Sequence, residues 1–266
     1  MFSDGQGETD GQGSVLMRPR SGSQSVQRAI AVLDCFTRSR TDLGVTDVAA
    51  HTGLKPSTAH RLIRALVDAG LLGQDDRTER YHLGPTLVAM GRRAETALGF
   101  DRFEPDLRAL SARTGESVNL GTRVGDEVLV ALHLPSRQPL RFDQPVGSRI
   151  PLHASAMGKA MLAFAEDTDR EVAALGDLVS FTASTITSTQ ALLDDLAETR
   201  RRGWAMNDGE RDPGVRTIGV PLLRADGRPF AAVALQGPDV RIRDDRVVEL
   251  AADLMQTATN LTRSSY

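Results

Sequence analysis

The stretch that most restricts the fold is VTDVAAHTGLKPSTAHRLIRALVDAGLL, residues 45–72. Its second half carries apolar residues at the helical spacing i, i+3, i+4 and i+7, namely Ala59, Leu62, Ile63 and Leu66. Pro56 suits the first position of this helix, because the N–H that proline lacks has no partner there. A shorter helix precedes it, for which we predict Thr46 as the N-cap and Gly53 as the turn residue. Two helices joined by a tight turn predict a helix-turn-helix.

The flanking segments complete this motif. From Ser25 onward, one predicted helical face carries Val26, Ala29, Ile30, Leu33 and Phe36. After a predicted helix end at Ala69 and Gly70, the segment LLGQDDRTERYHL, residues 71–83, predicts two short strands around a charged tip at residues 75–77. Such a hairpin is a wing, so we expect a winged helix-turn-helix over residues 23–83. Cys35 is the only cysteine, so it forms no internal disulfide, and its apolar neighbours predict that it is buried.

The second helix of the motif carries a polar and basic face that a purely structural helix does not need. Hydroxyl and N–H groups at its start can bind phosphate oxygens, while its longer side chains can reach base edges in a major groove. The predicted DNA contacts are Lys55, Ser57, Thr58, His60, Arg61, Arg64, Arg77 and Arg28. The alternative is a helical hairpin with a solvated basic face, but the turn spacing and the wing favour DNA.

The distribution of charge supports this interpretation more than the total does. The whole chain has a net charge of -3 and a pI near 6.0, which gives no sign of a nucleic-acid partner. Between Met17 and Arg64, however, eight basic residues stand against three acidic ones. A local excess of this kind is typical of an interaction segment. No apolar run approaches the ~18 residues of a membrane-spanning helix, and the N-terminus does not resemble a signal peptide, so we expect a cytoplasmic protein without a membrane partner.

The rest of the chain predicts an α+β organisation. Residues 1–22 are glycine-rich and are predicted to be a disordered tail, and residues 84–100 are predicted to form a linker helix. Residues 101–266 then combine helices with hairpins, the clearest over 118–134, where Val128, Val130, Leu132 and Leu134 are expected on one face. Further helices are predicted at 105–115, 154–165, 189–202 and 242–261, with strands at 215–223 and 230–236. These features predict a sensor-like domain with an antiparallel sheet.

Catalytic and metal-binding interpretations of this second half are weaker. Ser155 and Lys159 have the spacing Ser-x-x-x-Lys, which differs from the Ser-x-x-Lys of penicillin-recognising enzymes, and nothing places a base beside Ser155. His133, His153 and Glu210 are candidates for a shared metal, but histidines so far apart in sequence are more often pocket or surface residues. No metal site and no catalytic residue are therefore predicted. Glycine-rich nucleotide loops are absent from the sequence, so no cofactor is expected.

Several motifs in a fixed order resemble the IclR family of bacterial transcriptional regulators. Besides residues 45–72, they are YHLGPTLVAMGR, RIPLHASAMGKAMLA, FTASTIT, LLDDLAETRRRGWAMNDGE and GVRTIGVPLLRADGRPFAAVALQGP. The resemblance spans the chain from about Ser23 to its last helix. It implies a winged helix-turn-helix, a linker helix and a GAF-like effector-binding domain, assembled as homodimers or homotetramers and without catalysis.

By motif position, the resemblance also implies an effector pocket. It nominates Met157, Gly158, Asn207, Val215, Thr217, Ile218, Ala234 and Gln236, and the hairpin residues Asn119 and His133 are added from their place on the adjacent strands. Backbone N–H groups near Gly158 are expected to be able to hold a carboxylate. This chain departs from the family pattern at Asn207, Thr217 and Gly219, where an acid, a cysteine and an alanine are common. A relative's ligand is therefore not carried over.

The sequence thus predicts a DNA-binding regulator controlled by a small-molecule effector, for which the resemblance suggests small organic or aromatic acids. The alternative is a small-molecule-binding or hydrolytic enzyme whose helix-turn-helix contacts proteins. The two differ in their partners, because only a regulator needs a double-stranded operator, which is near-palindromic when a two-fold dimer presents two recognition helices.

Overall fold

A computed structural model describes residues 21–39 and 41–263, which divide into two compact units between Arg92 and Arg93. The predicted tail lies outside the described residues except for its last two positions, which already belong to a helix. Among the described helices, none is long and apolar enough to cross a membrane.

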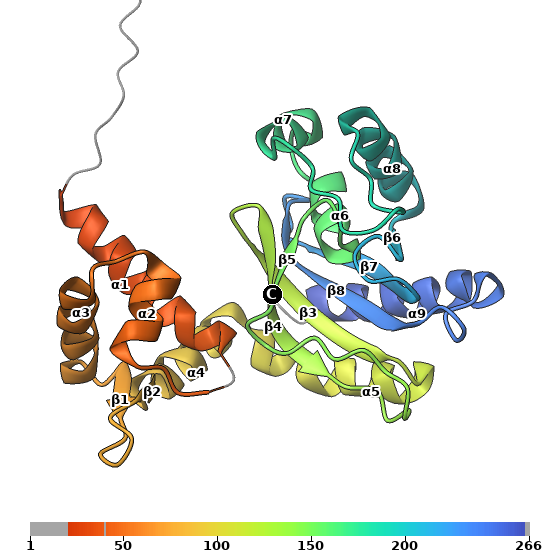
Figure 1. The fold of residues 1–266 in the computed structure, drawn as a ribbon. Coiled ribbons are helices and arrows are strands. Elements are labelled where there is room, and N and C mark those ends of the chain that lie inside the picture. The colour runs from red at the N-terminus through yellow and green to blue at the C-terminus, as the bar shows by residue number, and fades with distance from the viewer. Residues whose placement is uncertain (1–20, 40, 264–266) are drawn as a thin grey trace, which may run out of the picture. The chain divides into compact units, whose positions relative to one another are not determined.

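The N-terminal unit is a winged helix-turn-helix, as predicted. It contains α1 (Ser21–Arg38), α2 (Val45–Thr52), α3 (Pro56–Asp68), β1 (Leu72–Gln74) and β2 (Tyr81–Leu83), followed by the start of α4 (Thr86–Leu98). The two strands pair antiparallel as the wing (Figure 1). A small core joins the three helices to the wing, with Val32, Val48, Ala59, Ile63 and Leu72 each at most 2% exposed.

Most local predictions for this unit are confirmed, and two are wrong. Pro56 begins α3, and Gly53 turns the chain in the left-handed conformation at φ 66°, where a side chain would be strained. Thr46 is not the N-cap of α2; Gly44 holds that position, and its N–H donates to the Asp47 carboxylate at 2.9 Å. Gly44 has no cap side chain, so Asp47 supplies only the reciprocal hydrogen bond of a capping box. This backbone hydrogen bond is the main reason why the pKa of Asp47 is lowered.

The second wrong prediction concerns the buried face of α1. Val26 and Ile30 are 60% and 53% exposed, whereas Val32, Cys35 and Phe36 enter the core. Only the C-terminal half of α1 therefore packs on α2 and α3, and the apolar residues nearer its start have no buried contact within the described unit.

The C-terminal unit is built on one six-stranded antiparallel sheet with the order β5-β4-β3-β8-β7-β6. Its strands are β3 (Ser117–Val124), β4 (Glu127–Leu134), β5 (Arg149–Pro151), β6 (Ala205–Asp208), β7 (Val215–Leu223) and β8 (Pro229–Pro238). Its helices are η1 (Phe100–Arg102), α5 (Glu104–Thr114), α6 (Ala156–Ala163), α7 (Thr168–Ala174), α8 (Thr189–Arg202) and α9 (Asp244–Arg263). Together with the first unit this gives the predicted α+β class.

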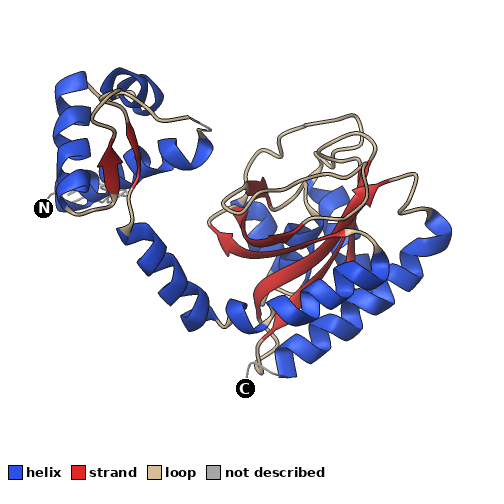
Figure 2. Ribbon diagram, turned by 90° about the horizontal axis from the view of Figure 1, so that it is seen from below, coloured by secondary structure: helices blue, strands red, loops and turns tan. Residues whose placement is uncertain are grey.

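Helices lie on both faces of the sheet (Figure 2), and each face carries its own apolar layer. One layer packs α5 and α9 against residues such as Leu120, Ile218 and Leu235. The other packs α6 and α8 against Val128, Ile150 and Ala234. Both faces of the sheet are therefore covered, which explains why its central strands are almost entirely buried.

The predicted hairpin of β3 and β4 is present, but the prediction for its faces is wrong. The pairing slips between Leu120 and Gly121 because β4 carries one extra residue there. As a result, Val128 and Val130 face α6, whereas Leu132 and Leu134 face α5. The short elements β5, β6, α7 and η1 have no counterpart among the sequence predictions.

Candidate functional site

The exposed side of α3 carries the residues predicted to contact DNA. Lys55 precedes the helix, and the exposed side chains of Ser57, His60, Arg61 and Arg64 follow it, while Thr58 is half-buried. The two other predicted contacts lie apart from this helix: Arg77 at the tip of the wing and Arg28 on α1, both exposed.

These cations are free to meet an anionic partner. Lys55, Arg61, Arg64, Arg77 and Arg28 have no carboxylate within ion-pair distance among the described residues. The next basic residue of the wing behaves differently. The guanidinium of Arg80, which the sequence analysis did not single out, donates to Asp47 at 2.6 Å and to the Asp42 carbonyl at 2.8 Å. Arg80 therefore connects the wing to α2 by an ion pair rather than remaining available for DNA.

In the C-terminal unit, the strand register places one polar residue of each of five strands in a row. The cross-strand pairs are His133 with Asn119, Asn119 with Ala234, Gln236 with Thr217, and Thr217 with Asn207. Because paired residues, and residues two apart on a strand, share a face, the row lies on the α6 side of the sheet. Its members are His133, Asn119, Gln236, Thr217 and Asn207.

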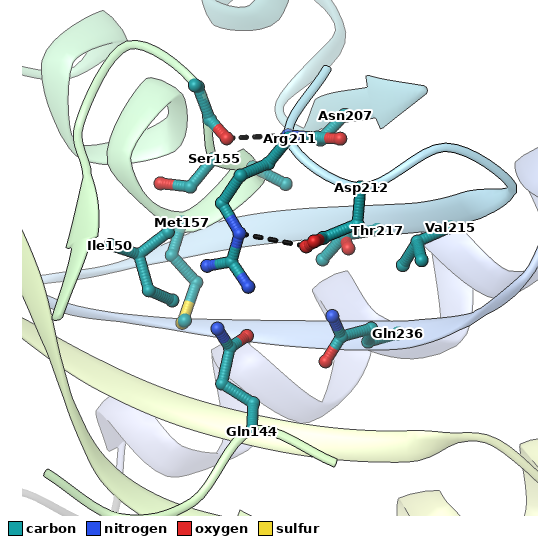
Figure 3. Close-up of a pocket in the computed structure, with 12 residues that line it drawn as sticks. Gln144, Ile150, Ser155, Met157, Asn207, Arg211, Asp212, Val215, Thr217 and Gln236 are labelled. Carbon is teal, nitrogen blue, oxygen red and sulfur yellow. Dashed lines mark hydrogen bonds and ion pairs between the residues drawn. The ribbon is translucent and has the colours of Figure 1, made fainter. Parts of the chain in front are cut away.

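A cavity lies over the β8–β7–β6 end of this row (Figure 3). It is lined by Gln144, Ile150, Ala154, Ser155, Ala156, Met157, Asn207, Arg211, Asp212, Val215, Thr217 and Gln236. The cavity volume is about 20 Å³, which is room for about one water molecule. Side chains therefore fill most of the space between the sheet and the loops above it.

One side chain filling this space belongs to Arg211. It extends from the loop after β6, and its guanidinium lies between Met157 and Asp212 (Figure 3). Its Nε donates to the Asp212 carboxylate at 2.9 Å. When the Gln144 amide is oriented with its oxygen toward the guanidinium, that oxygen accepts from both terminal nitrogens of Arg211, at 2.8 and 3.1 Å. A guanidinium held in this way offers a carboxylate two parallel N–H groups.

The loop that carries Arg211 is held through its neighbour Glu210. The Glu210 N–H donates to the Asn207 side chain at 3.2 Å, and its carbonyl accepts from the Thr185 hydroxyl. Asn207 in turn donates to the Ala154 carbonyl at 2.7 Å. The residues of the FTASTIT and HASAMGKA motifs thus position the start of this loop.

The side chain of Glu210 is fixed as well, by a buried ion pair. Lys159 is 1% exposed, and its ammonium group donates to Glu210 at 2.6 Å and lies 3.0 Å from Asp195. Burial raises the pKa of the Glu210 carboxyl above its ordinary value, which the charge of Lys159 partly offsets. Neither Lys159 nor Glu210 lines the cavity. The pair therefore contributes by stabilising the loop that carries Arg211.

Five of the ten residues predicted for the effector pocket line this cavity: Met157, Asn207, Val215, Thr217 and Gln236. Asn119 and His133 lie one hydrogen bond and two hydrogen bonds behind Gln236. The remaining three lie elsewhere. Ile218 belongs to the layer on the opposite face of the sheet, and Ala234 is buried in the core with Met157.

Gly158, the third of these, has a packing role. A Cβ atom on Gly158 would lie 2.3 Å from the Leu152 carbonyl oxygen, so only glycine allows α6 to approach that strand end. Its N–H donates to the Ser155 hydroxyl at 3.0 Å, so this one N–H group already has a partner. Arg211, Gln144 and Asp212 were missed, because they lie in loops whose proximity the sequence pattern does not reveal.

The groups that prompted catalytic and metal-binding alternatives are engaged in structural contacts. Ser155 caps α6, and His153 Nε2 lies 3.0 Å from the Val179 carbonyl. No three His, Cys, Asp or Glu side chains of the described residues lie together as a metal site would require. Nothing in this arrangement activates Ser155 as a nucleophile.

Comparison with known families identifies both units. Residues 100–263 match the family model described as bacterial transcriptional regulator IclR C-terminal, and residues 25–76 match the IclR helix-turn-helix domain. Together the two matches cover most of the chain.

Individual relatives agree with these matches. The HTH-type transcriptional regulator BhcR of Paracoccus denitrificans is 34% identical over 91% of this chain and 87% of its own. The transcriptional repressor IclR of Escherichia coli is 30% identical over 94% and 93%. Among solved structures, an IclR homolog from Microbacterium hydrocarbonoxydans, complexed with 4-hydroxybenzoate, superimposes with a TM-score of 0.78 at 25% identity, covering 90% of this chain and 99% of that one.

Proposed function

This chain belongs to the IclR family of DNA-binding transcriptional regulators, and we propose that α3 reads an operator while a small carboxylate in the cavity beside Arg211 controls its DNA affinity. The observation that carries the DNA half is the row of unpaired basic side chains on α3. The observation that carries the effector half is a guanidinium placed inside a cavity otherwise lined by neutral groups and a single carboxylate.

For the DNA half, α3 enters the major groove with its N-terminal end first. Ser57 binds a phosphate through its hydroxyl and its backbone N–H, and Lys55 and the wing residue Arg77 bind phosphates through their charged side chains. Arg61 and Arg64 are one turn apart on the exposed face, so both reach the floor of the same groove. Arg61 lies nearer the helix start and is proposed to contact a base.

Arg61→Ala is expected to weaken binding to the operator about 10- to 100-fold, because a bidentate base contact contributes about 1–3 kcal/mol of discrimination. Binding to random DNA should fall much less. Fluorescence anisotropy measures both, using a duplex from upstream of the chain's own gene and a scrambled duplex at two salt concentrations.

The matched control for Arg61 is Arg137→Ala, because Arg137 is also an exposed arginine, lies in the other unit and has no ion pair with the described residues. It should leave both affinities unchanged. Equal losses on operator and random DNA in Arg61→Ala, with a log–log salt slope smaller by about 0.9, would mean that Arg61 contacts a phosphate only.

For the effector half, the donors around the cavity favour an anion. Arg211 carries a permanent charge, and the hydroxyls of Thr217 and Ser155 can also donate. An acid enters when Arg211 and Gln144 move aside, since the free volume is small, and its carboxylate then replaces Asp212 as the partner of Arg211. The 4-hydroxybenzoate bound by the structural relative supports including aromatic acids among the candidates. Acetate, propionate, succinate, benzoate and 4-hydroxybenzoate form a suitable acid panel.

We also propose that the chain functions as a homo-oligomer. Apolar side chains on two helices are not covered by the described residues: Val26 and Ile30 on α1, and Val88 and Met90 on α4, are all more than half exposed. No residue of α4 is buried at all. Light scattering of the full chain should give at least twice the monomer mass, and Val88→Asp combined with Met90→Asp should lower it; a monomeric wild type would remove the two-fold operator model.

A further inference from the structure

Gln236 lies at the middle of the polar row. The orientation of its amide group depends on the side chains of Asn119 and His133, which lie farther from the cavity. The Gln236 oxygen accepts from Asn119 Nδ2 at 3.1 Å. Asn119 Oδ1 lies 2.7 Å from Nδ1 of His133. Asn119 is fully buried and Gln236 is 5% exposed, so neither amide can exchange these partners for bulk water.

The other end of the Gln236 amide faces the cavity. Figure 3 shows its nitrogen directed toward the space occupied by Arg211. This nitrogen makes no hydrogen bond within the described part of the chain. Because an amide nitrogen can only donate, the cavity at this point accepts an oxygen of a ligand and rejects a second donor.

For the Gln236 oxygen to face the cavity instead, donor and acceptor would have to exchange in each hydrogen bond from His133 through Asn119 to Gln236. If His133 Nδ1 were bare, it would accept from Asn119, whose oxygen would then accept from Gln236, and the Gln236 oxygen would face the cavity. Each amide can turn by rotation, but only a proton can change the role of the imidazole nitrogen. His133 therefore decides between the two arrangements.

We infer that His133, with a proton on Nδ1, acts through Asn119 as a positioning residue that keeps the Gln236 amide nitrogen facing the cavity and so selects ligands with an acceptor group. Its other nitrogen, Nε2, lies 3.5 Å from the Asp143 carboxylate, which in turn pairs with Arg141. At that distance the contact of Nε2 is weak, whereas Nδ1 faces the Asn119 oxygen at 2.7 Å. Because that oxygen can only accept, the proton of this hydrogen bond belongs to Nδ1. The ligand part of this inference rests on the proposed carboxylate effector, whereas the state of His133 does not.

The state of His133 is measured directly in the full-length protein labelled with ¹⁵N-histidine. The chain has five histidines, so long-range ¹H–¹⁵N spectra are simple, and the signals lost in His133→Asn assign this residue. At pH 7.5 without ligand, Nδ1 should show the shift of a protonated ring nitrogen. A neutral ring with the proton on Nε2 and a bare Nδ1 would overturn the inference, whatever the effector is.

The consequence for ligands is measured by calorimetry with acids of the panel and their primary amides, such as propionate with propionamide and benzoate with benzamide. The wild type should prefer the acid. In His133→Phe the Asn119 oxygen loses its donor and the two amides can turn over, so the acid-to-amide preference should fall roughly tenfold, about the effect of one charge-assisted hydrogen bond. His133→Asn should restore it, because its side-chain nitrogen stands where Nδ1 stood.

These outcomes separate the inference from the proposed function. An unchanged preference in His133→Phe, or the same loss in His133→Phe and His133→Asn, would overturn the positioning role. If no acid of the panel binds the wild type, the proposed carboxylate effector fails, and the ¹⁵N spectra alone decide whether His133 holds Gln236 in the inferred orientation.

Discussion

Replacing Lys159 with methionine is expected to lower the free energy of unfolding of the C-terminal unit by about 3–5 kcal/mol, the usual cost of removing one partner from a buried ion pair. Lys159 is the single cation between Glu210 and Asp195, at 2.6 and 3.0 Å. Its loss leaves the buried Glu210 carboxylate without its counter-charge and removes the ion-pair partner of Asp195. Urea denaturation followed by the fluorescence of Trp204, the only tryptophan and a residue of this unit, measures the change.

The two ends of this pair should differ in their effects. Glu210→Gln is expected to cost clearly less than Lys159→Met, because Lys159 keeps Asp195 as a partner. The double variant Lys159→Met with Glu210→Gln should be more stable than Lys159→Met alone. The reason is that it removes the buried Glu210 charge, which has no partner in the single variant. Equal costs for the two single variants would contradict this account and would indicate loss of packing instead.

The deficit of Lys159→Met should also depend on pH. Burial raises the pKa of Glu210 in the folded chain, and without Lys159 the shift grows. The folded state then binds a proton more readily than the unfolded state, for which a glutamate pKa is about 4.3. Stability therefore falls as the pH rises above that value. The variant should be closest to wild type near pH 5 and furthest from it near pH 8, and Glu210→Gln should abolish the trend.

How much of the fold the sequence predicts depends on whether the signals are local. The helix-turn-helix was predictable because Pro56, Gly53 and the apolar stripe of α3 each act over a few residues. The buried face of α1 was not, since Val26 and Ile30 fit a helical stripe but lie beyond the reach of α2 and α3. The slip between Leu120 and Gly121 was likewise hidden, because one extra residue in a strand leaves no compositional mark.

The candidate site divides in the same way. Residues on strands followed from the resemblance and from strand alternation, and the register then brought Asn207, Thr217 and Gln236 together. The loop residues of the site could not be predicted. Gln144 and Arg211 are 67 positions apart in sequence and meet only when the sheet is assembled. Gly158 was nominated by motif position, and its close approach to Leu152 became visible only in the assembled fold.

Arg211→Met is expected to weaken binding of any acid of the panel by about a hundredfold. A bidentate, charge-assisted contact between guanidinium and carboxylate is roughly twice as strong as a neutral hydrogen bond, and methionine keeps the apolar stem while removing all five N–H groups. Calorimetry on the full chain measures the affinity, and the change in operator affinity at saturating acid measures the response. Arg211→Lys keeps the charge but loses the paired N–H groups, so its affinity for the acid should lie between those of the wild type and Arg211→Met.

The adjacent residue provides a control with the opposite sign. Asp212 is the present partner of the Arg211 guanidinium, at 2.9 Å, so it competes with a ligand carboxylate for the same N–H groups. Asp212→Asn should therefore tighten acid binding, although it changes the same wall of the cavity. A loss of affinity in both variants would mean that the loop merely shapes the cavity. Opposite changes in neighbouring residues follow only if Arg211 exchanges one carboxylate for another when the effector enters.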